Sequence, residues 1–223
     1  MTSFNVAIDG PAGAGKSTVA KKVAEKLGFL YIDTGAMYRA LTQAALATNV
    51  DLYDEKALNN LLMESELELS PSSTGTTVFW NGEDITEDIR SNKVNQNVSL
   101  VSSYKQVRLN MMEKQQKLAS EKHAVLDGRD IGTHVLPKAD VKIFLTASVD
   151  ERAKRRHSEQ INKGLQSNLE DIKRDIEKRD ELDSSRAFAP LKKADDARVL
   201  DTTKMDINQV TDAILDFVKE HSI

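Results

Sequence analysis

The sequence predicts an α/β fold in which a parallel sheet of five strands is covered by helices on both faces. Short apolar runs alternate with longer stretches of helical spacing, and each apolar run ends on an aspartate or a threonine. The chain is long enough to enclose a core, since 39% of its 223 residues are hydrophobic. The expected strands are residues 4–9, 29–33, 124–127, 141–146 and 198–202. Because ligands of such sheets bind beyond the carboxyl ends of the strands, we expect the functional site there.

One region interrupts this alternation of strands and helices. Residues 67–85 place Ser-Ser-Thr-Gly and then Asn81-Gly82 between residues of high strand propensity, and Asn-Gly is the strongest short signal for a hairpin. We therefore expect a small antiparallel insert inside a second subdomain. The expected division is a core domain of residues 1–33 and 109–223 and a subdomain of residues 34–108, with the insert at about residues 65–90.

Composition narrows the class of function. The chain has no cysteine, which excludes disulfides and a cysteine nucleophile, and its four histidines lack metal-ligand spacing. The first twenty-five residues contain charges and no continuous apolar run, so we expect neither a signal peptide nor a membrane span. A net charge of −4 argues against a general nucleic-acid surface. We expect a cytoplasmic monomer whose partner is a small anion, with neither nucleic acid nor membrane as a partner.

The segment that follows the first expected strand carries the most specific motif. Residues 10–18 read GPAGAGKST and match G-x-x-x-x-G-K-[ST], the P-loop motif, between an apolar strand and a helical pattern. Glycines let backbone N–H groups converge on phosphate oxygens, Lys16 neutralises the β and γ phosphates, and Ser17 offers a hydroxyl to Mg²⁺. A glycine-rich helix entry without a ligand is the alternative, which the context disfavours. We predict a site for ATP and Mg²⁺ formed by Gly10, Pro11, Ala12, Gly13, Ala14, Gly15, Lys16, Ser17 and Thr18.

Two classes of protein use such a loop, nucleotide switches and kinases. A GTPase switch would carry the base-reading motif N-K-x-D, but the nearest string, residues 92–95, reads NKVN and lies beside the insert. A small-molecule kinase needs a second anion site, an acceptor pocket and a mobile basic lid, because phosphoryl transfer depends on positioning and charge neutralisation. The chain offers candidates for all three, so a kinase is favoured.

Candidates for the second anion site follow the second and third strands. After the second strand a helical pattern begins, in which Thr34 is the expected N-cap and Arg39 projects from the first turns. After the third strand, residues 127–130 read DGRD and place three charges beside a run that should be buried, where charges need partners or a ligand. A solvent-facing Arg39 and an internal ion pair within DGRD are the alternatives, and the second does not exclude binding.

A helical pattern from about residue 169 to residue 186 supplies a candidate for the acceptor pocket. Its apolar stripe begins at Ile172 and Ile176, and steps of three and four residues continue it into Arg179, Asp183 and nearly Arg186. Charged residues therefore occupy the face that began as core. We expect this face to meet a polar ligand, the alternative being a helix end that emerges into solvent.

The candidate lid begins after the fourth strand. Residues 151–156 read ERAKRR and place three arginines within five positions at the start of a helix. Such a run is usually a solvated face, but a P-loop in the same chain favours a lid that clamps the transferring phosphoryl group, at about residues 150–165.

Together these motifs resemble those of a known enzyme family. In chain order they are GPAGAGKST, DTGAMYR, DGRDIGT followed by Pro137, VKIFLTASVDERAKRR and KRDELDSSRAFAPL. This set resembles bacterial cytidylate kinase over nearly the whole chain. The resemblance implies a P-loop nucleoside monophosphate kinase with an antiparallel insert, which transfers the γ-phosphoryl group of ATP to CMP or dCMP.

The resemblance also implies roles for individual residues. The CMP phosphate would be held by Thr34, Arg39 and Arg129, and Tyr38 of the same DTGAMYR motif would line the substrate site. Cytosine would be read by Ser99, Arg108 and Asp130. The ribose would meet Arg179 and Asp183, with Arg186 near the reacting phosphates. The lid would consist of Arg152, Arg155 and Arg156. Apart from the resemblance, the position of Asp127 at the end of the third strand leads us to expect that it orients a water on Mg²⁺. Two departures from the family are mild, a threonine at position 34 for serine and Ser17 within Gly-Lys-Ser-Thr for Gly-Lys-Gly-Thr, and both keep a hydroxyl.

Catalysis is expected to be electrostatic, because the acceptor is an ionised phosphate oxygen that needs no covalent nucleophile and no dedicated base. The residues expected to offset charge on the transferring group are Lys16, Arg129, Arg152, Arg155, Arg156 and Arg186. Another P-loop kinase, for adenylate or a small metabolite, and a non-catalytic ATP-binding switch are the alternatives.

Overall fold

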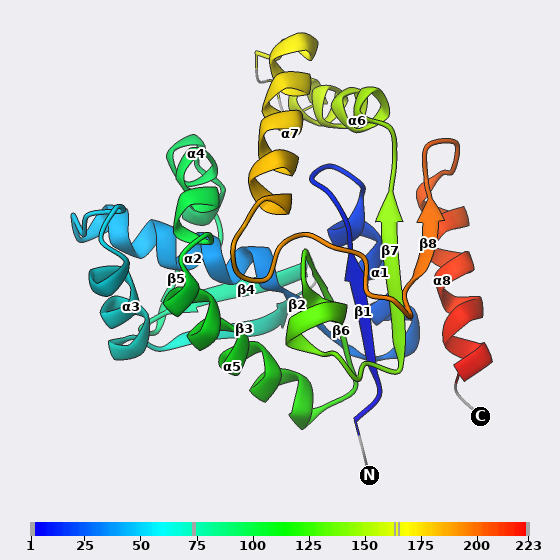
Figure 1. Cartoon of the computed structure of the whole chain (residues 1–223), viewed down its shortest axis with the longest axis horizontal. Helices are drawn as coiled ribbons and strands as arrows, with labels where there is room; N and C mark the ends of the chain where they lie inside the picture. Colours follow the sequence, from blue (N-terminus) through cyan, green and yellow to red (C-terminus); the bar gives the residue numbers. More distant parts are fainter. Residues whose placement is uncertain (1–2, 73–74, 163, 165, 222–223) are drawn as a thin grey trace.

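A five-stranded parallel sheet forms the centre of the molecule, in the order β2-β6-β1-β7-β8 (Figure 1). The computed structural model describes residues 3–72, 75–162, 164 and 166–221. The strands are β1 (Asn5–Asp9), β2 (Leu30–Asp33), β6 (Ala124–Gly128), β7 (Val141–Thr146) and β8 (Arg198–Asp201). Every pairing between neighbours in this sheet is parallel. The five expected strands and their parallel arrangement are confirmed.

Helices cover both faces of the sheet. They are α1 (Lys16–Leu27), α2 (Thr34–Ala47), α3 (Glu55–Glu64), α4 (Asn92–Val101), α5 (Lys105–Glu121), α6 (Val149–Asn162), α7 (Leu169–Ser184) and α8 (Ile207–His221), with short helical turns η1 (Asp88–Arg90) and η2 (Ile131–Val135). Val6 and Ile8 of β1 lie in the core formed with α1 and α8, whereas Ala7 lies in the core formed with α2 and α5. Successive strand residues point to opposite faces, so one strand supplies two cores. None of the helices described is long and apolar enough to cross a membrane.

The antiparallel insert is also present. It consists of β3 (Leu67–Ser72), β4 (Gly75–Trp80) and β5 (Glu83–Asp84). Trp80 pairs with Glu83, and the two residues between them, Asn81 and Gly82, have φ angles of 51° and 82°. Positive φ at both positions defines the two-residue hairpin turn that Asn-Gly favours. Val78 and Trp80 are buried in the same core as α2 and α5, so the insert is joined to the sheet by apolar packing.

The carboxyl ends of three neighbouring strands place acidic residues close together. Asp33 at the end of β2 pairs with Asp127 of β6, and Asp9 at the end of β1 pairs with Gly128. The segment between β1 and α1 begins at this edge, and α6 and α7 lie beyond the ends of β1 and β7 (Figure 1). The topology thus places the loop of residues 10–18, the ends of β2 and β6, and the helices α6 and α7 at one edge of the sheet.

Candidate active site

The loop between β1 and α1 is shaped to present backbone N–H groups. Gly13 and Gly15 have φ angles of 77° and 86°, which glycine adopts readily, and a Cβ at Gly10 would lie only 2.0 Å from the Leu145 carbonyl oxygen. The N–H groups of Gly13, Gly15, Lys16 and Ser17 donate no hydrogen bond within the described part of the chain. Free N–H groups at a helix N-terminus form an anion site.

Lys16 lies inside this loop and is nearly buried. Its Nζ donates to the Pro11 carbonyl oxygen at 2.8 Å. Burial and the nearby positive charge of Arg129 lower the pKa of Lys16 to about 7. The ammonium group therefore sits among other cations, a placement that an anionic ligand would relieve.

Asp127, at the end of β6, connects Ser17 with Tyr31. The Ser17 hydroxyl donates to Asp127 Oδ2 and the Tyr31 hydroxyl to Asp127 Oδ1, each at 2.8 Å. Burial and the charge of Asp33 raise the pKa of the Asp127 carboxyl group. A hydroxyl and a carboxylate are oxygen ligands of the kind Mg²⁺ prefers, so these side chains fit that ion. The described residues contain no cluster of three or more His, Asp or Glu side chains that could hold a metal ion.

The start of α2 differs from the expectation. Asp33 is the N-cap, because its Oδ1 accepts from the Ala36 N–H at 2.7 Å, so the prediction that Thr34 caps this helix is wrong. Thr34 is the first helical residue, and its hydroxyl donates instead to the Asp127 carbonyl oxygen at 2.6 Å. Arg39 pairs with Asp33 at 3.0 Å and is mostly shielded from solvent, unlike the solvent-facing alternative.

The C-terminal half of α7 connects several of the predicted substrate residues. Asp183 is buried and accepts from Arg129 Nε at 2.8 Å and from Arg186. Burial raises the pKa of Asp183, but the charges of Arg129 and Arg186 outweigh this effect and hold it below its usual value. Asp183 is therefore a carboxylate that fixes two arginines at the sheet edge.

A second buried pair lies beside this group. Arg108 NH2 and Asp130 Oδ2 are 2.5 Å apart, and Arg108 NH1 donates to the Ser102 carbonyl oxygen at 2.9 Å. Arg186 donates to the Ser102 hydroxyl at 3.1 Å, which joins the two groups. The centroid of the Tyr38 ring lies 5.6 Å from the Arg108 guanidinium carbon, and burial raises the pKa of Tyr38 to about 12.

Two buried arginine nitrogens have no hydrogen-bond partner among the described residues. Arg179 Nε and Arg108 Nε are buried and make no hydrogen bond with the residues described. Burial and the charge of Arg129 lower the pKa of Arg179 to about 10, and Arg156 and Arg39 add to this effect. Unpaired buried charges are costly, so this cluster of cations indicates a site for a polyanion.

The three predicted lid arginines of α6 take different positions. Arg152 is buried and donates to the carbonyl oxygens of Ala147 and Ala12, at 3.0 and 2.9 Å, rather than lying over the loop as a mobile clamp. Arg155 donates to the Thr202 carbonyl oxygen at 2.6 Å, which ties α6 to the end of β8. Arg156 is half-buried and has no hydrogen-bond partner in the described chain, while its charge acts on Arg179.

Sequence reasoning missed four residues that hold the site together. Ser102 could not be identified from the sequence because its carbonyl group and its hydroxyl act together only in the folded chain. The Ser102 hydroxyl donates to the Ser99 carbonyl oxygen at 3.2 Å. The others are Asp9, Asp33 and Asp180. Asp9 accepts from the N–H groups of Ile131 and Gly132 at 2.8 and 2.7 Å, and burial raises its pKa to about 7. The position of Asp9 at a strand end was the signal that could have found it.

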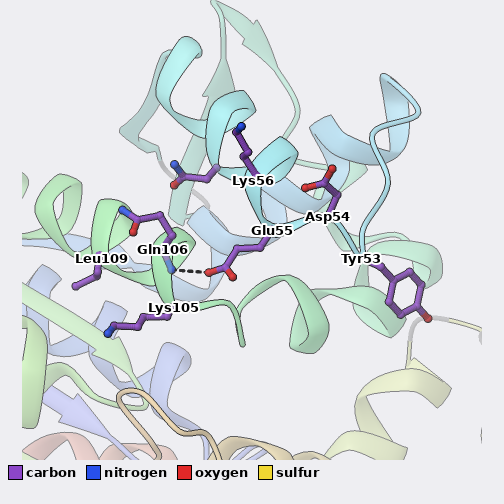
Figure 2. A pocket seen from close by; sticks show the side chains of 8 residues that line it. Tyr53, Asp54, Glu55, Lys56, Lys105, Gln106 and Leu109 are labelled. Carbon is purple, nitrogen blue, oxygen red and sulfur yellow. Dashed lines mark hydrogen bonds between the residues drawn. The ribbon is translucent and has the colours of Figure 1, made fainter.

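An open groove of about 790 Å³ lies elsewhere, between the N-terminal ends of α3 and α5 (Figure 2). Glu55 accepts from the Gln106 N–H there at 2.7 Å, and Tyr53 is exposed at its rim. None of the predicted site residues lines this groove.

Comparison with known proteins identifies the family. A model of the family described as cytidylate kinase matches residues 6–220. Cytidylate kinase of Shouchella clausii is 70% identical over 219 residues, which cover 98% of this chain and 97% of that protein. Cytidylate kinase of Bacillus subtilis is 53% identical over 219 residues, which cover 98% of each chain.

A solved structure shows a similar fold at low sequence identity. It is an uncharacterized protein from Eubacterium ventriosum, with a TM-score of 0.52 and 17% identity, covering 97% of this chain and 99% of that one. Because the family match and the two related kinases span nearly the entire sequence, the chain belongs to the cytidylate kinase family.

Proposed function

We propose that this protein transfers the γ-phosphoryl group of ATP to CMP, and also to dCMP, to form ADP with CDP or dCDP. Family membership supports CMP phosphorylation, and one structural observation carries the proposal. Arg179 is half-buried, and its buried, unpartnered Nε lies among cations from the P-loop, α2, α6 and the end of β6. Such a cluster fits two phosphate groups brought together for transfer.

The donor side of the proposed site is the loop of residues 10–18. Its free N–H groups would hold the β and γ phosphates of ATP, and Lys16 would regain full charge beside them. Ser17 and Asp127 would hold Mg²⁺, Asp127 through a water, and the ion would neutralise charge on the phosphates. Tyr31 keeps the Asp127 carboxylate oriented.

The acceptor phosphate is assigned to Arg39 and Arg129. Asp33 and Asp183 hold these guanidinium groups in place, and a guanidinium can bind two phosphate oxygens at once. Thr34 would have to release the Asp127 carbonyl oxygen to donate to phosphate, so its contribution is the smaller one.

The base is assigned to the buried pair of Arg108 and Asp130, and the sugar is assigned to Arg179 and Asp183 of α7. Asp130 Oδ2 pairs with Arg108, which leaves Oδ1 to accept from the cytosine amino group. Arg108 and Ser99 would serve the ring nitrogen and the carbonyl edge, with the Tyr38 ring packed against Arg108. Arg179 and Asp183 would meet the ribose, and Arg186 would lie near the reacting phosphates.

Transfer itself needs little covalent help from the protein. The acceptor oxygen is ionised and attacks the γ phosphorus in line, while Lys16, Arg129, Arg156 and Arg186 offset charge on the transferring group. Closure of α6 over the loop would exclude water, which otherwise hydrolyses ATP. The monomeric state and cytoplasmic location expected from the sequence stay predictions.

An ADP-release assay tests this proposal with CMP, dCMP, UMP, AMP and GMP as acceptors. We expect the highest kcat/KM with CMP and activity with dCMP. ADP formation that is independent of every acceptor would indicate a hydrolase or switch instead, and preference for AMP would indicate an adenylate kinase activity.

A further inference from the structure

Ala12, in the middle of the P-loop, has both of its backbone polar groups held by side chains from outside the loop. Its N–H donates to Asp180 Oδ1 of α7 at 3.1 Å, and its carbonyl oxygen accepts from Arg152 NH1 of α6 at 2.9 Å. Arg152 and Asp180 also pair with each other, at 2.5 Å. A carboxylate from α7 and a guanidinium from α6 thus hydrogen-bond to the same residue of the phosphate-binding loop.

The hydrogen bond to the Ala12 carbonyl oxygen determines where the N–H group of Gly13 points. In a trans peptide the carbonyl oxygen and the following N–H point in opposite directions. The Arg152 contact with the Ala12 carbonyl therefore directs the Gly13 N–H away from the Arg152 guanidinium and leaves this N–H free for a phosphate oxygen. Glycine at position 13 makes rotation of this peptide easy, so the loop's own sequence does not prevent a flip.

Packing at Gly13 supports the same arrangement. A Cβ at this position would lie 3.2 Å from the Arg152 Cβ and 3.7 Å from the Ile176 Cδ1. Ile176 and Ile172 of α7 pack with Ala153 of α6 in one small core. The loop is therefore seated in the junction of two helices that are themselves joined.

We propose that Asp180 and Arg152 are positioning residues, which hold the P-loop in its phosphate-binding conformation and connect it to the acceptor side of the site. Asp180 follows Arg179 directly and lies one helical turn before Asp183, the two residues of α7 assigned to the ribose. CMP that fixes α7 would also fix Asp180 against Ala12, so CMP should tighten the binding of the ATP phosphates. This inference rests on the proposed function.

The test compares variants of Asp180, which remove or keep its hydrogen bond to Ala12, with a variant of a matched ion pair on the same two helices. Asp180→Ala removes the contacts of Asp180 with the Ala12 N–H and with Arg152. Asp180→Asn keeps an oxygen that can accept from the Ala12 N–H. Asp150→Asn is the control, because Asp150 pairs with Lys173 across α6 and α7 at 2.6 Å without touching the P-loop. Each variant is assayed for KM of ATP, for Kd of CMP without nucleotide and for Tm, and for its affinity for the non-hydrolysable analogue AMP-PNP with and without CMP.

We expect Asp180→Ala to raise KM for ATP by about tenfold or more, while Kd for CMP without nucleotide changes by less than about threefold. The tightening of AMP-PNP binding by CMP should fall to near zero in this variant. Asp180→Asn should recover part of both effects, and Asp150→Asn should match the wild type within about twofold. If Asp180→Ala does not fold, Asp180→Asn carries the comparison with the control.

Two outcomes separate this inference from the proposed function. A folded Asp180→Ala variant with the wild-type KM for ATP and the wild-type effect of CMP on AMP-PNP would overturn the inference, since a lowered Tm alone indicates a pair that only supports the fold. Wild-type protein that forms no CMP-dependent ADP would overturn the proposed function, whatever the variants do.

Discussion

At the scale of single residues, Lys16 couples nucleotide binding to pH. Its pKa is lowered to about 7 by burial and by Arg129, and a bound triphosphate would raise it again. Above this pH the free protein has lost the proton that the complex holds, so ATP binding takes up a proton. We expect Kd for AMP-PNP to rise as pH increases above about 7, by up to about tenfold per pH unit.

Calorimetry at about pH 8 in two buffers of different ionisation enthalpy measures this proton uptake, which should approach one proton per nucleotide. Lys16→Met is the control and should abolish the uptake together with most of the affinity. Equal uptake in the Lys16→Met variant would assign the proton to another group, such as Asp9 or Asp127.

Asp130 is the residue that decides between bases in the proposed site. UMP presents a carbonyl oxygen where CMP has its amino group, and a carboxylate repels that oxygen. Asp130→Asn can still accept from Arg108 through its Oδ1 and can donate to uracil from its Nδ2. We expect the ratio of kcat/KM for CMP to that for UMP to fall by about tenfold or more.

The ratio is the appropriate readout because Asp130 forms a buried pair with Arg108, and damage to the fold would depress both acceptors together. An unchanged ratio in a folded Asp130→Asn protein would place the base-reading group elsewhere.

At the scale of elements, α6 presents two adjacent arginines with different surroundings. Arg155 is engaged by Glu151 and by the Thr202 carbonyl oxygen, whereas Arg156 has no hydrogen-bond partner among the residues described. We expect Arg156→Ala to lower kcat by roughly 10²-fold with little change in Tm, because in the proposed function this charge would face the transferring group. Arg155→Ala should instead lower Tm and reduce kcat by less than about tenfold.

Steady-state assays at saturating ATP and CMP, together with thermal scans, distinguish the two variants. Equal losses of kcat would mean that both arginines reach the phosphates when α6 closes. An unchanged kcat in Arg156→Ala would make this residue part of a solvated face.

At the scale of the whole molecule, stability and activity are supported by different regions. Ile214 of α8 is completely buried in the core with α1 and β7, and α8 carries none of the predicted site residues. Ile214→Ala should cost about 2–5 kcal/mol of unfolding free energy. Each kcal/mol corresponds to a decrease of about 2–4 °C in Tm for a chain of this size.

Thermal or denaturant unfolding measures this loss, and kcat at a temperature well below Tm should stay near that of the wild type. Ile207→Ala is the matched control on the same helix, because Ile207 is 47% exposed and its truncation should change stability little. A large loss of kcat in folded Ile214→Ala would show that α8 acts on the site.

The sequence by itself determined the elements and the type of site. Short apolar runs located all five strands, Asn81-Gly82 located the hairpin turn, and the motif of residues 10–18 located the phosphate loop. These features can be read from the sequence because each depends on neighbouring residues, through a continuous apolar run, backbone φ or a short loop.

Only the tertiary structure decided which charged group meets which. Asp33 rather than Thr34 caps α2, and Arg152 turns to Ala12, from which it is separated by 140 residues in sequence. With 30% of residues charged, many pairings fit the sequence equally well. The choice among these pairings depends on distances across the folded chain and on which charged side chains are buried away from water. Burial makes an unpaired charge costly in free energy, so buried charges need specific partners.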